Sequence, residues 1–464
     1  MAQLPNHNKE TFSMAARAAG VLLHPTSLPN RVLDGHAWRF LDWMQEAGLA
    51  IWQLLPLTAP HDDLSPYHSL SAFALNTRLL PAGWELQVDE QAFARYLEQP
   101  PHWLNDYALF MVLREQFGHM PWSQWPEPYR LRNPVALAQV ADERLDDILQ
   151  LKKAQFQLHQ LWMQLRQDAA QRGIQLFGDM PIFVSYDSVE VWVQPQQFRL
   201  DDNLQPTVVT GVPPDYFSET GQRWGNPHYD WDAMQKDNFG WWCRRVEAAL
   251  ELFDLVRIDH FRGLEASWEI DAAEPTAING SWQKAPGEQL LARLQQIFNP
   301  LPLVAEDLGI ITPEVVALKD QFGLPGMSVL QFGFSGLPDN PHSPYELVQN
   351  SVVYTGTHDN DTTMGWLATL HPGTRDWMMT QVAQDAGEMP WPLIVTGLQS
   401  VADRVIVPMQ DWLGLDGEHR MNVPGTTENN WHWQFQWHQV PDELAGHIRY
   451  WIGQSNRLQQ AGET

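Results

Sequence analysis

Cysteine is almost missing from this chain: among 464 residues there is Cys243 and no other. A single cysteine cannot form an internal disulfide, and disulfides are the usual reinforcement of proteins in oxidising compartments. The opening stretch, MAQLPNHNKETFSMAARAAGVLLHP, also lacks the basic segment, apolar segment and cleavage site of a secretory signal. Both absences predict a cytoplasmic protein.

Positive charge is scarce as well. The chain has 29 Lys and Arg against 56 Asp and Glu, a formal net charge of −27. Nucleic acids bind to basic faces, so this balance argues against a nucleic-acid partner. No apolar run comes near the ~18 residues of a membrane span, which argues against a membrane protein. The composition is typical of a globular protein that acts on a neutral molecule.

Two patterns that mark cofactor sites are also absent. No G-x-G-x-x-G segment follows an expected strand, which argues against an open doubly wound sheet that binds a dinucleotide. The cluster HDND (358–361) could alternatively be interpreted as a metal site, but it lacks the residue spacing of a zinc motif or an EF-hand. We therefore expect neither a cofactor nor a bound metal.

Tryptophan, in contrast, is abundant, with 23 in the chain. Indole faces pack against the C–H faces of sugar rings, so an excess is one sign of a carbohydrate groove. The alternative is that tryptophans fill the core, which the 44% of hydrophobic residues make large. We expect most of them to be buried and a minority to meet a ligand.

Eight short apolar runs recur along the chain, each ending in polar residues, glycine or proline. They are apolar on both alternating faces, as strands of a buried parallel sheet are. Helical patterns separate many of them, for instance at 37–48, 287–298 and 312–323. This alternation predicts an α/β fold, the (β/α)8 TIM barrel. The runs are GVLLHP (20–25), IWQLLPL (51–57), IQLFGDMPIFV (174–184), LVRIDHF (255–261), PLVAEDLG (302–309), GMSVLQFGF (326–334), VVYTGTHD (352–359) and RVIVPMQD (404–411).

Two segments are too long for simple crossovers between strands. Residues 77–172 have helical spacing and are rich in Leu, Ala, Gln and Trp, which predicts an inserted helical subdomain. Residues 185–250 are rich in Pro, Gly, Asp and aromatics and lead into a helical pattern near 239–253. We expect this second insertion to cover the carboxyl-terminal mouth of a single catalytic barrel formed by residues 1–464.

Acidic side chains fall where the expected strands end. Asp259, Glu306 and Asp359 lie at carboxyl-terminal strand ends, where barrels of this kind place active residues. Asp179 lies near the middle of the third run. A single such residue is more often a helix cap or part of a surface ion pair. Several carboxylates at one mouth raise one another's pKa at a cost in stability, which indicates a function.

The neighbours of these carboxylates suggest a division of roles. Alternation places Arg257 on the same strand face as Asp259, where a guanidinium keeps the carboxylate ionised, as a nucleophile must be. Glu306 follows two apolar residues, which raises its pKa and lets it donate a proton. Cleavage of a glycosidic bond with retention of the anomeric configuration requires one ionised carboxylate and one protonated carboxyl group. His358 and Asp359 suit hydrogen bonds to sugar hydroxyls.

These residues resemble the 4-α-glucanotransferases (amylomaltase, or disproportionating enzyme) of glycoside hydrolase family 77, within the α-amylase clan. The resemblance covers nearly the whole chain, and its motifs are highly specific in combination. They are GVLLHPTSLP, SPYHSLSAFALN, GDMPIFVSYDS, GVPPDYFSETGQRWGNP, VRIDHFRG, VAEDLG, YTGTHDNDTT and MNVPGTTENNWHW. Two segments depart from the family pattern, NRVLDGHAWRF (30–40) and APHDDLSPY (59–67).

The resemblance implies a role for each site residue. Asp259 is then the nucleophile, Glu306 the general acid/base and Asp359 the stabiliser of the transition state. Residues 211–227 form a mobile loop over the acceptor sites, and no calcium is needed. The implied substrate-binding residues are Tyr67, Asp179, Asp215, Gln222, Trp224, Arg257, His358 and Asn430.

The implied activity is the transfer of an α-1,4-glucan segment to the 4-hydroxyl of a glucose or glucan acceptor, through a covalent glycosyl-aspartate. The alternative is an α-amylase-like hydrolase, in which water replaces the acceptor. A loop such as 211–227 that seats a sugar and excludes water favours transfer. A catalytically inactive sugar-binding protein would need a broken set of carboxylates, and here Asp259, Glu306 and Asp359 are all present.

Overall fold

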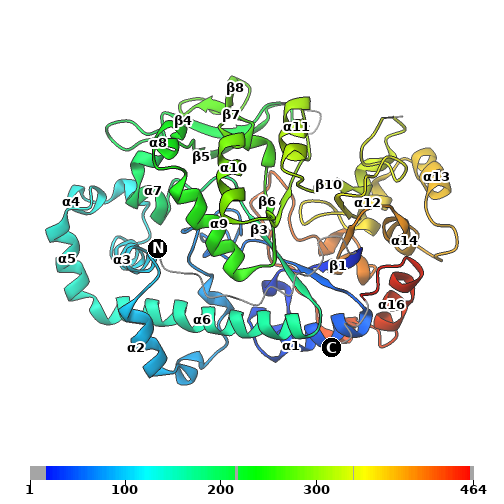
Figure 1. Cartoon of the computed structure of the whole chain (residues 1–464), viewed down its shortest axis with the longest axis horizontal. Coiled ribbons are helices and arrows are strands. Elements are labelled where there is room, and N and C mark those ends of the chain that lie inside the picture. The colour runs from blue at the N-terminus through cyan, green and yellow to red at the C-terminus, as the bar shows by residue number, and fades with distance from the viewer. Residues whose placement is uncertain (1–16, 215–217, 338, 460–464) are drawn as a thin grey trace.

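The centre of the protein is a sheet of eight parallel strands, seen in a computed structural model that describes residues 17–214, 218–337 and 339–459 (Figure 1). The strand order is β10-β11-β12-β1-β2-β3-β6-β9. The main-chain N–H of Ala305, at the end of β9, donates to the carbonyl of Pro325, just before β10, at 2.8 Å. This contact brings the two edges together, so the sheet forms the predicted barrel. Its strands are β1 (Ala18–Leu22), β2 (Ile51–Gln53), β3 (Gln175–Met180), β6 (Leu255–Ile258), β9 (Leu303–Ala305), β10 (Gly326–Val329), β11 (Ser351–Tyr354) and β12 (Arg404–Pro408).

Burial on both faces explains why these runs form a barrel. Alternate residues such as Leu22, Phe177 and Ile406 belong to one apolar cluster to which all eight strands contribute. The residues between them, such as Val21 and Val405, belong to a second cluster shared with the helices. Apolar side chains on both alternations therefore fill the barrel and attach the helices, as the continuous apolar runs predicted.

Sixteen helices are described among residues 17–214, 218–337 and 339–459, and the predicted helical patterns at 37–48, 287–298 and 312–323 are confirmed as α1, α10 and α11. Figure 1 shows helices of the barrel and of its insertions around the central strands. Their bounds are α1 (Gly35–Ala47), α2 (Glu90–Glu98), α3 (Leu104–Gln116), α4 (Glu127–Arg130), α5 (Pro134–Glu143), α6 (Leu145–Gln171), α7 (Val189–Val193), α8 (Trp231–Lys236), α9 (Gly240–Leu252), α10 (Gly287–Ile297), α11 (Pro313–Gln321), α12 (Thr363–Thr369), α13 (Pro372–Gln381), α14 (Trp391–Gln399), α15 (Met409–Trp412) and α16 (Leu444–Gln454).

The segment 77–172 is helical, containing α2 to α6 and short 3-10 turns. The helix α6 is the longest of them, with 27 residues, and runs from the end of the molecule that holds α3 to α5 towards α1 (Figure 1). It ends four residues before β3, so the chain returns from the insertion directly into the barrel. None of the helices in the described ranges combines the length and the apolar character needed to cross a bilayer.

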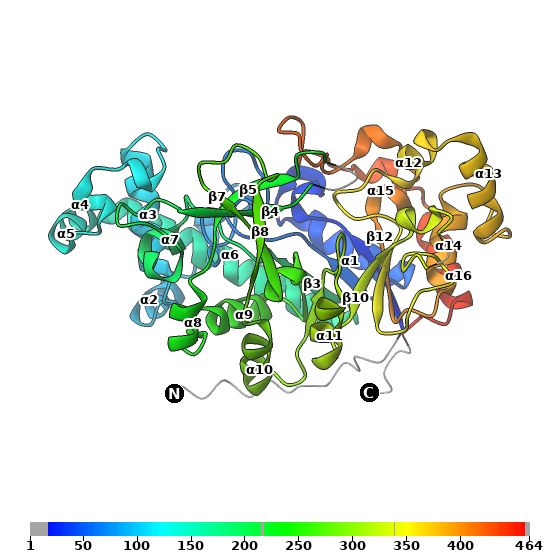
Figure 2. The same ribbon diagram turned by 90° about the horizontal axis from the view of Figure 1, so that it is seen from above.

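A second, antiparallel sheet lies beside the barrel, with the order β5-β4-β7-β8 (Figure 2). The sequence analysis did not predict it. Every residue of β8 is exposed, so this strand has no apolar run by which it could be recognised. The strands are β4 (Val208–Val212), β5 (Gln222–Pro227), β7 (Ala266–Asp271) and β8 (Gly280–Lys284).

Candidate active site

Three neighbouring barrel strands bring acidic side chains to the same mouth. Asp179 is the penultimate residue of β3, Asp259 directly follows β6, and Glu306 directly follows β9. β6 pairs with both β3 and β9, so these strand ends lie next to one another. Asp359 lies in the loop that follows β11, beyond the strand end at which the sequence analysis placed it.

Arg257 links two of these carboxylates. Its Nη1 lies 2.6 Å from Oδ2 of Asp179, and its Nη2 lies 2.9 Å from Oδ1 of Asp259. The phenol of Tyr67 also donates to Oδ2 of Asp179, at 2.6 Å. The sequence predicted the contact with Asp259, because both residues share one strand face. The contact with Asp179 depends on the register between β3 and β6, which places Asp179 opposite Arg257.

The pKa of Asp259 is set by burial as well as by Arg257. Burial raises this pKa to about 6; Arg257 opposes the rise, while the charge of Asp179 adds to it. Arg257 therefore reduces the effect of burial without cancelling it, partly because its guanidinium is shared with a second carboxylate. Asp259 is ionised above this pKa, so the predicted ionised form applies at neutral pH.

Glu306 is placed to hold a proton. Its burial raises the pKa to about 7, against the opposing charge of Arg257, and the charge of Asp259 raises it further. The main-chain N–H groups of His260 and Leu308 donate to its two carboxyl oxygens at 2.6 and 3.1 Å and lower the pKa. Burial therefore favours the protonated form of Glu306, whereas the contact with Arg257 favours the ionised form of Asp259.

Asp359 has the opposite electrostatic setting. Its side chain is about half exposed, so the desolvation that would raise its pKa is limited, and His358, 3.3 Å from its Oδ2, and the Asn422 amide, 2.6 Å from its Oδ1, outweigh it and lower the pKa. Asp359 is therefore ionised throughout the neutral range. The sequence analysis missed Asn422, although it lies in the quoted motif MNVPGTTENNWHW; one amide in a loop carries no signal of its own.

Asn430, from the same motif, has its amide engaged within the loop. Its Nδ2 donates to the carbonyl of Thr426 at 2.9 Å, and its Oδ1 accepts from the N–H of Val423 at 2.9 Å. These bonds close the turn between Asn422 and Asn430. A direct contact of Asn430 with substrate stays a prediction.

Aromatic rings form one wall of the mouth. Tyr67 stacks on His358 with ring centroids 5.0 Å apart and an interplanar angle of 15°. Trp431 lies 5.9 Å from the Tyr67 ring and 6.0 Å from the His358 ring. These rings come from three distant parts of the chain and pack against one another beside Asp179 and Asp359.

Trp224 and Gln222 lie on β5, and Trp224 contacts His260, the residue that follows Asp259. Trp224 is 38% exposed, and its indole N–H donates to the Gln222 side chain at 3.1 Å. Its ring stands nearly perpendicular to the ring of His260, with centroids 4.8 Å apart. Asp215, the remaining predicted contact from the 211–227 segment, lies outside the described residues.

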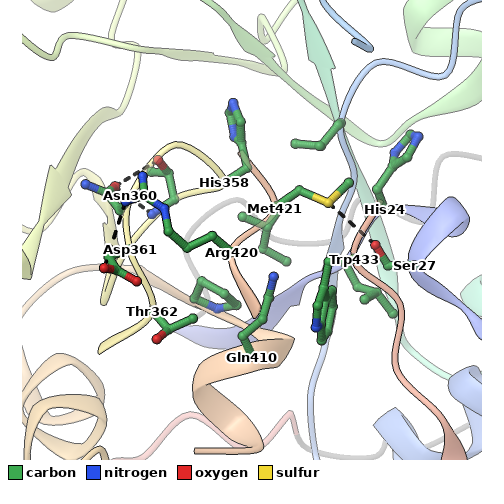
Figure 3. A pocket seen from close by; sticks show the side chains of 15 residues that line it. His24, Ser27, His358, Asn360, Asp361, Thr362, Gln410, Arg420, Met421 and Trp433 are labelled. Carbon is green, nitrogen blue, oxygen red and sulfur yellow. Dashed lines mark hydrogen bonds and ion pairs between the residues drawn. The ribbon is translucent and has the colours of Figure 1, made fainter. Parts of the chain in front are cut away.

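A small pocket, partly open to solvent, borders the site at His358 (Figure 3). Burial lowers the pKa of His24, at the end of β1, to about 3, and the charge of His358 adds to this effect, so His24 is neutral. Three buried polar atoms near this pocket lack a hydrogen-bond partner within the described ranges: His24 Nδ1, Asp361 Oδ1 and Trp433 Nε1. The pocket is lined by Leu22, Leu23, His24, Ser27, Leu55, Thr357, His358, Asn360, Asp361, Thr362, Pro408, Gln410, Arg420, Met421 and Trp433.

A parallel barrel whose mouth holds two carboxyl groups at the ends of adjacent strands has the architecture of a (β/α)8-barrel enzyme acting on glycosidic bonds. Comparison with known families agrees. The family model described as 4-alpha-glucanotransferase, glycoside hydrolase family 77, matches residues 23–83 and 82–439. The chain belongs to this family of hexosyltransferases.

Individual relatives cover the chain almost from end to end. It is 44% identical to the 4-alpha-glucanotransferase of Thermus thermophilus, over 95% of this chain and 99% of the relative. It is 39% identical to the chloroplastic/amyloplastic 4-alpha-glucanotransferase of Solanum tuberosum, over 90% and 82% of the two chains. Among solved structures, the amylomaltase from Streptococcus agalactiae in complex with acarbose matches with a TM-score of 0.91 and 32% identity, over 96% of this chain and 100% of that one.

Proposed function

We propose that this 4-alpha-glucanotransferase transfers α-1,4-glucan segments by a retaining double displacement in which Asp259, Glu306 and Asp359 are the catalytic groups. The donor is an α-1,4-glucan or maltooligosaccharide, and the acceptor is glucose or a maltooligosaccharide. The observation that carries this proposal is the placement of Asp259 and Glu306 at the neighbouring strand ends of β6 and β9, where Arg257 contacts Asp259 and burial raises the pKa of Glu306.

In the first step, a carboxylate oxygen of Asp259 attacks the anomeric carbon of the donor, and the glycosidic C–O bond breaks. Glu306 gives its proton to the departing oxygen, so the leaving sugar is released with a hydroxyl group. The product is a glycosyl ester on Asp259 with inverted configuration. Asp359 and His358 hydrogen-bond the sugar hydroxyls as the ring flattens, while Arg257 orients the nucleophile.

In the second step, the ionised Glu306 takes the proton from the 4-hydroxyl of the acceptor. The acceptor oxygen attacks the anomeric carbon, the ester bond to Asp259 breaks, and the original configuration returns. Water in place of the acceptor gives hydrolysis. The exposed indole of Trp224, which contacts His260 beside Asp259, and the amide of Gln222 favour an acceptor sugar over water.

The remaining contacts serve the donor. Tyr67 supplies an aromatic face for the sugar whose bond is broken, and Asp179 fixes the phenol and the guanidinium that surround it. Asn430 and Asp215 complete the proposed substrate contacts. Neither a cofactor nor a metal takes part in these steps.

We also propose how the chain is organised around this site. Residues 1–464 form one catalytic unit, with 77–172 as a helical subdomain and 185–250, including 211–227, over the mouth. This arrangement is supported by the helices α2 to α6 and by β4 and β5 of the second sheet. The single cysteine and the acidic composition favour a cytoplasmic location.

Pure maltotriose is the substrate that tests this function. A transferase converts it into glucose and a series of longer maltooligosaccharides while the number of reducing ends stays constant, because each broken α-1,4 bond is replaced by another. An α-amylase-like hydrolase increases the number of reducing ends with every bond broken. Separation of the products by chromatography, together with a reducing-end assay on the same sample, decides between them, and Asp259→Asn is the inactive control.

A further inference from the structure

His260, directly after the proposed nucleophile, has an unusual backbone conformation. Its φ of 51° and ψ of 50° lie in the left-handed region, which is disfavoured for residues other than glycine because Cβ approaches the following carbonyl oxygen. This conformation aims its N–H at Oε2 of Glu306, 2.6 Å away. The next N–H, of Phe261, donates to the main-chain carbonyl of Glu306 at 3.1 Å. Two successive N–H groups thus hold the side chain and the backbone of Glu306.

The imidazole of His260 is held by packing on two sides. The Trp224 ring stands over it with centroids 4.8 Å apart and an interplanar angle of 88°. On another side lies Gly263, where a Cβ would come within 3.2 Å of the imidazole Cδ2. Burial lowers the pKa of His260 to about 3, with the charge of Arg262 adding to this, so the ring is neutral at working pH. Its Nε2 is buried and has no hydrogen-bond partner among the residues that the structure describes.

We propose that His260 is a positioning residue for Glu306: packing of its ring keeps its backbone left-handed, and this backbone fixes the carboxyl group that donates and accepts the catalytic proton. The proposal rests on the proposed role of Glu306. The bond from the His260 N–H goes to a group that becomes ionised after proton donation, so it stabilises the carboxylate form as well as its orientation. In this proposal the His260 ring positions Glu306 through packing alone, and neither a polar ring atom nor a charge of His260 contributes.

One consequence links the two halves of the site. Trp224, the proposed platform for the acceptor, is also the residue that covers His260. The acceptor side of the mouth and the acid/base group therefore share one aromatic contact.

Two substitutions at His260 separate the backbone from the ring. Valine is β-branched and resists the left-handed region, so His260→Val turns the N–H away from Glu306. Asparagine adopts the left-handed region more readily than most residues, so His260→Asn removes the imidazole and retains the backbone geometry. Circular dichroism and thermal unfolding establish that each variant is folded. His260→Ala replaces His260→Val in the comparison if the valine variant does not fold.

The measurement compares two donors, one that needs proton donation and one that does not. Transfer from maltotriose requires the acid, whereas ester formation from α-maltotriosyl fluoride does not, because fluoride leaves without a proton. We expect His260→Val to slow the maltotriose reaction on the order of tenfold or more, the effect of losing a hydrogen bond to a charged group, and to change the first-turnover rate with the fluoride much less. His260→Asn should recover most of the loss.

The pH profile gives a second readout that a purely structural role would not move. Loss of the N–H bond removes a contact that lowers the pKa of Glu306, so the alkaline limb of kcat/KM in His260→Val should shift to higher pH. The other groups facing this carboxyl, namely Arg257, Asp259 and the N–H of Leu308, remain in place.

Glu306→Gln is the reference that separates the two proposals. It should show a large difference between maltotriose and the fluoride; if it shows none, the role of Glu306 and that of His260 are both wrong. If Glu306→Gln shows the difference while His260→Val keeps the wild-type ratio of the two rates and the wild-type alkaline limb, only the positioning role is refuted. Equal losses in His260→Val and His260→Asn would also refute it, because the ring and not the backbone would then be responsible.

Discussion

Trp224 provides a sharp test of why this enzyme transfers sugar rather than hydrolysing it. The side chain is 38% exposed, which for a whole tryptophan area of ~250 Å2 leaves ~95 Å2 that an acceptor sugar can cover. At ~25 cal/mol per Å2, half to full coverage stabilises the bound acceptor by about 1.2–2.4 kcal/mol, roughly eight- to sixty-fold in acceptor binding. Trp224→Ala removes this face and leaves Asp259 intact.

We therefore expect Trp224→Ala to slow the formation of longer glucans from maltotriose by at least a factor in that range, because the variant also loses the contact with His260. The share of ester intermediates captured by water should rise, and it is measured as new reducing ends per bond broken. Trp377→Ala is a matched control, since Trp377 is similarly exposed, at 41%, but lies on α13 outside the site. If transfer and hydrolysis fall together in Trp224→Ala, so that their ratio is unchanged, the indole is a packing residue and the acceptor-platform explanation is wrong.

Three further predictions concern the carboxylates. Asp259→Asn should lower transfer by more than a hundredfold with an unchanged circular dichroism spectrum, because the amide has the same shape but is a poor nucleophile; a variant that keeps a tenth of wild-type transfer would exclude Asp259 from this role. The profile of kcat/KM against pH should be a bell, since activity is lost below a pKa of about 6 as Asp259 gains a proton and above about 7 as Glu306 loses one; a flat profile between pH 5 and 8 (roughly the span of both limbs) would contradict the assignment. Glu306→Gln should raise the Tm relative to wild type above pH 7 and leave it nearly unchanged below about pH 4. The reason is that a carboxyl group whose pKa is raised by folding makes the protein less stable as the pH rises from about 4 to about 7. An equal Tm difference at both pH values would contradict this linkage.

The sequence predicted the parts of this protein that follow a repeated physical pattern. All eight barrel strands carry apolar residues on both faces, and all eight formed where the runs indicated. The second sheet was missed because strands such as β8 are exposed and contribute no such run. At the site, alternation along β6 was enough to pair Arg257 with Asp259.

Contacts that depend on the meeting of separate segments could not be read from the sequence. The bond from Arg257 to Asp179 follows from strand register, and the bond from Asn422 to Asp359 follows from the path of a long loop. The rise in the pKa of Asp259 follows from burial, which composition does not locate. The left-handed backbone of His260 could not be predicted either, because the residue types Asp259, His260 and Phe261 do not specify this conformation.

The helix α6 has a consequence for how this protein could change in length. Its 27 residues span ~40 Å at 1.5 Å per residue, and its carboxyl end leads almost directly into the strand that carries Asp179. Adding one residue to this helix would rotate α2 to α5 by ~100° about the helix axis relative to the barrel strand that follows it. Adding seven residues, close to two whole turns, would restore the orientation and move the insertion outwards by ~10 Å. Homologues and engineered variants with a longer or shorter helical insertion should therefore differ in the length of α6 by about three, four or seven residues, because only such steps nearly restore the orientation of α2 to α5.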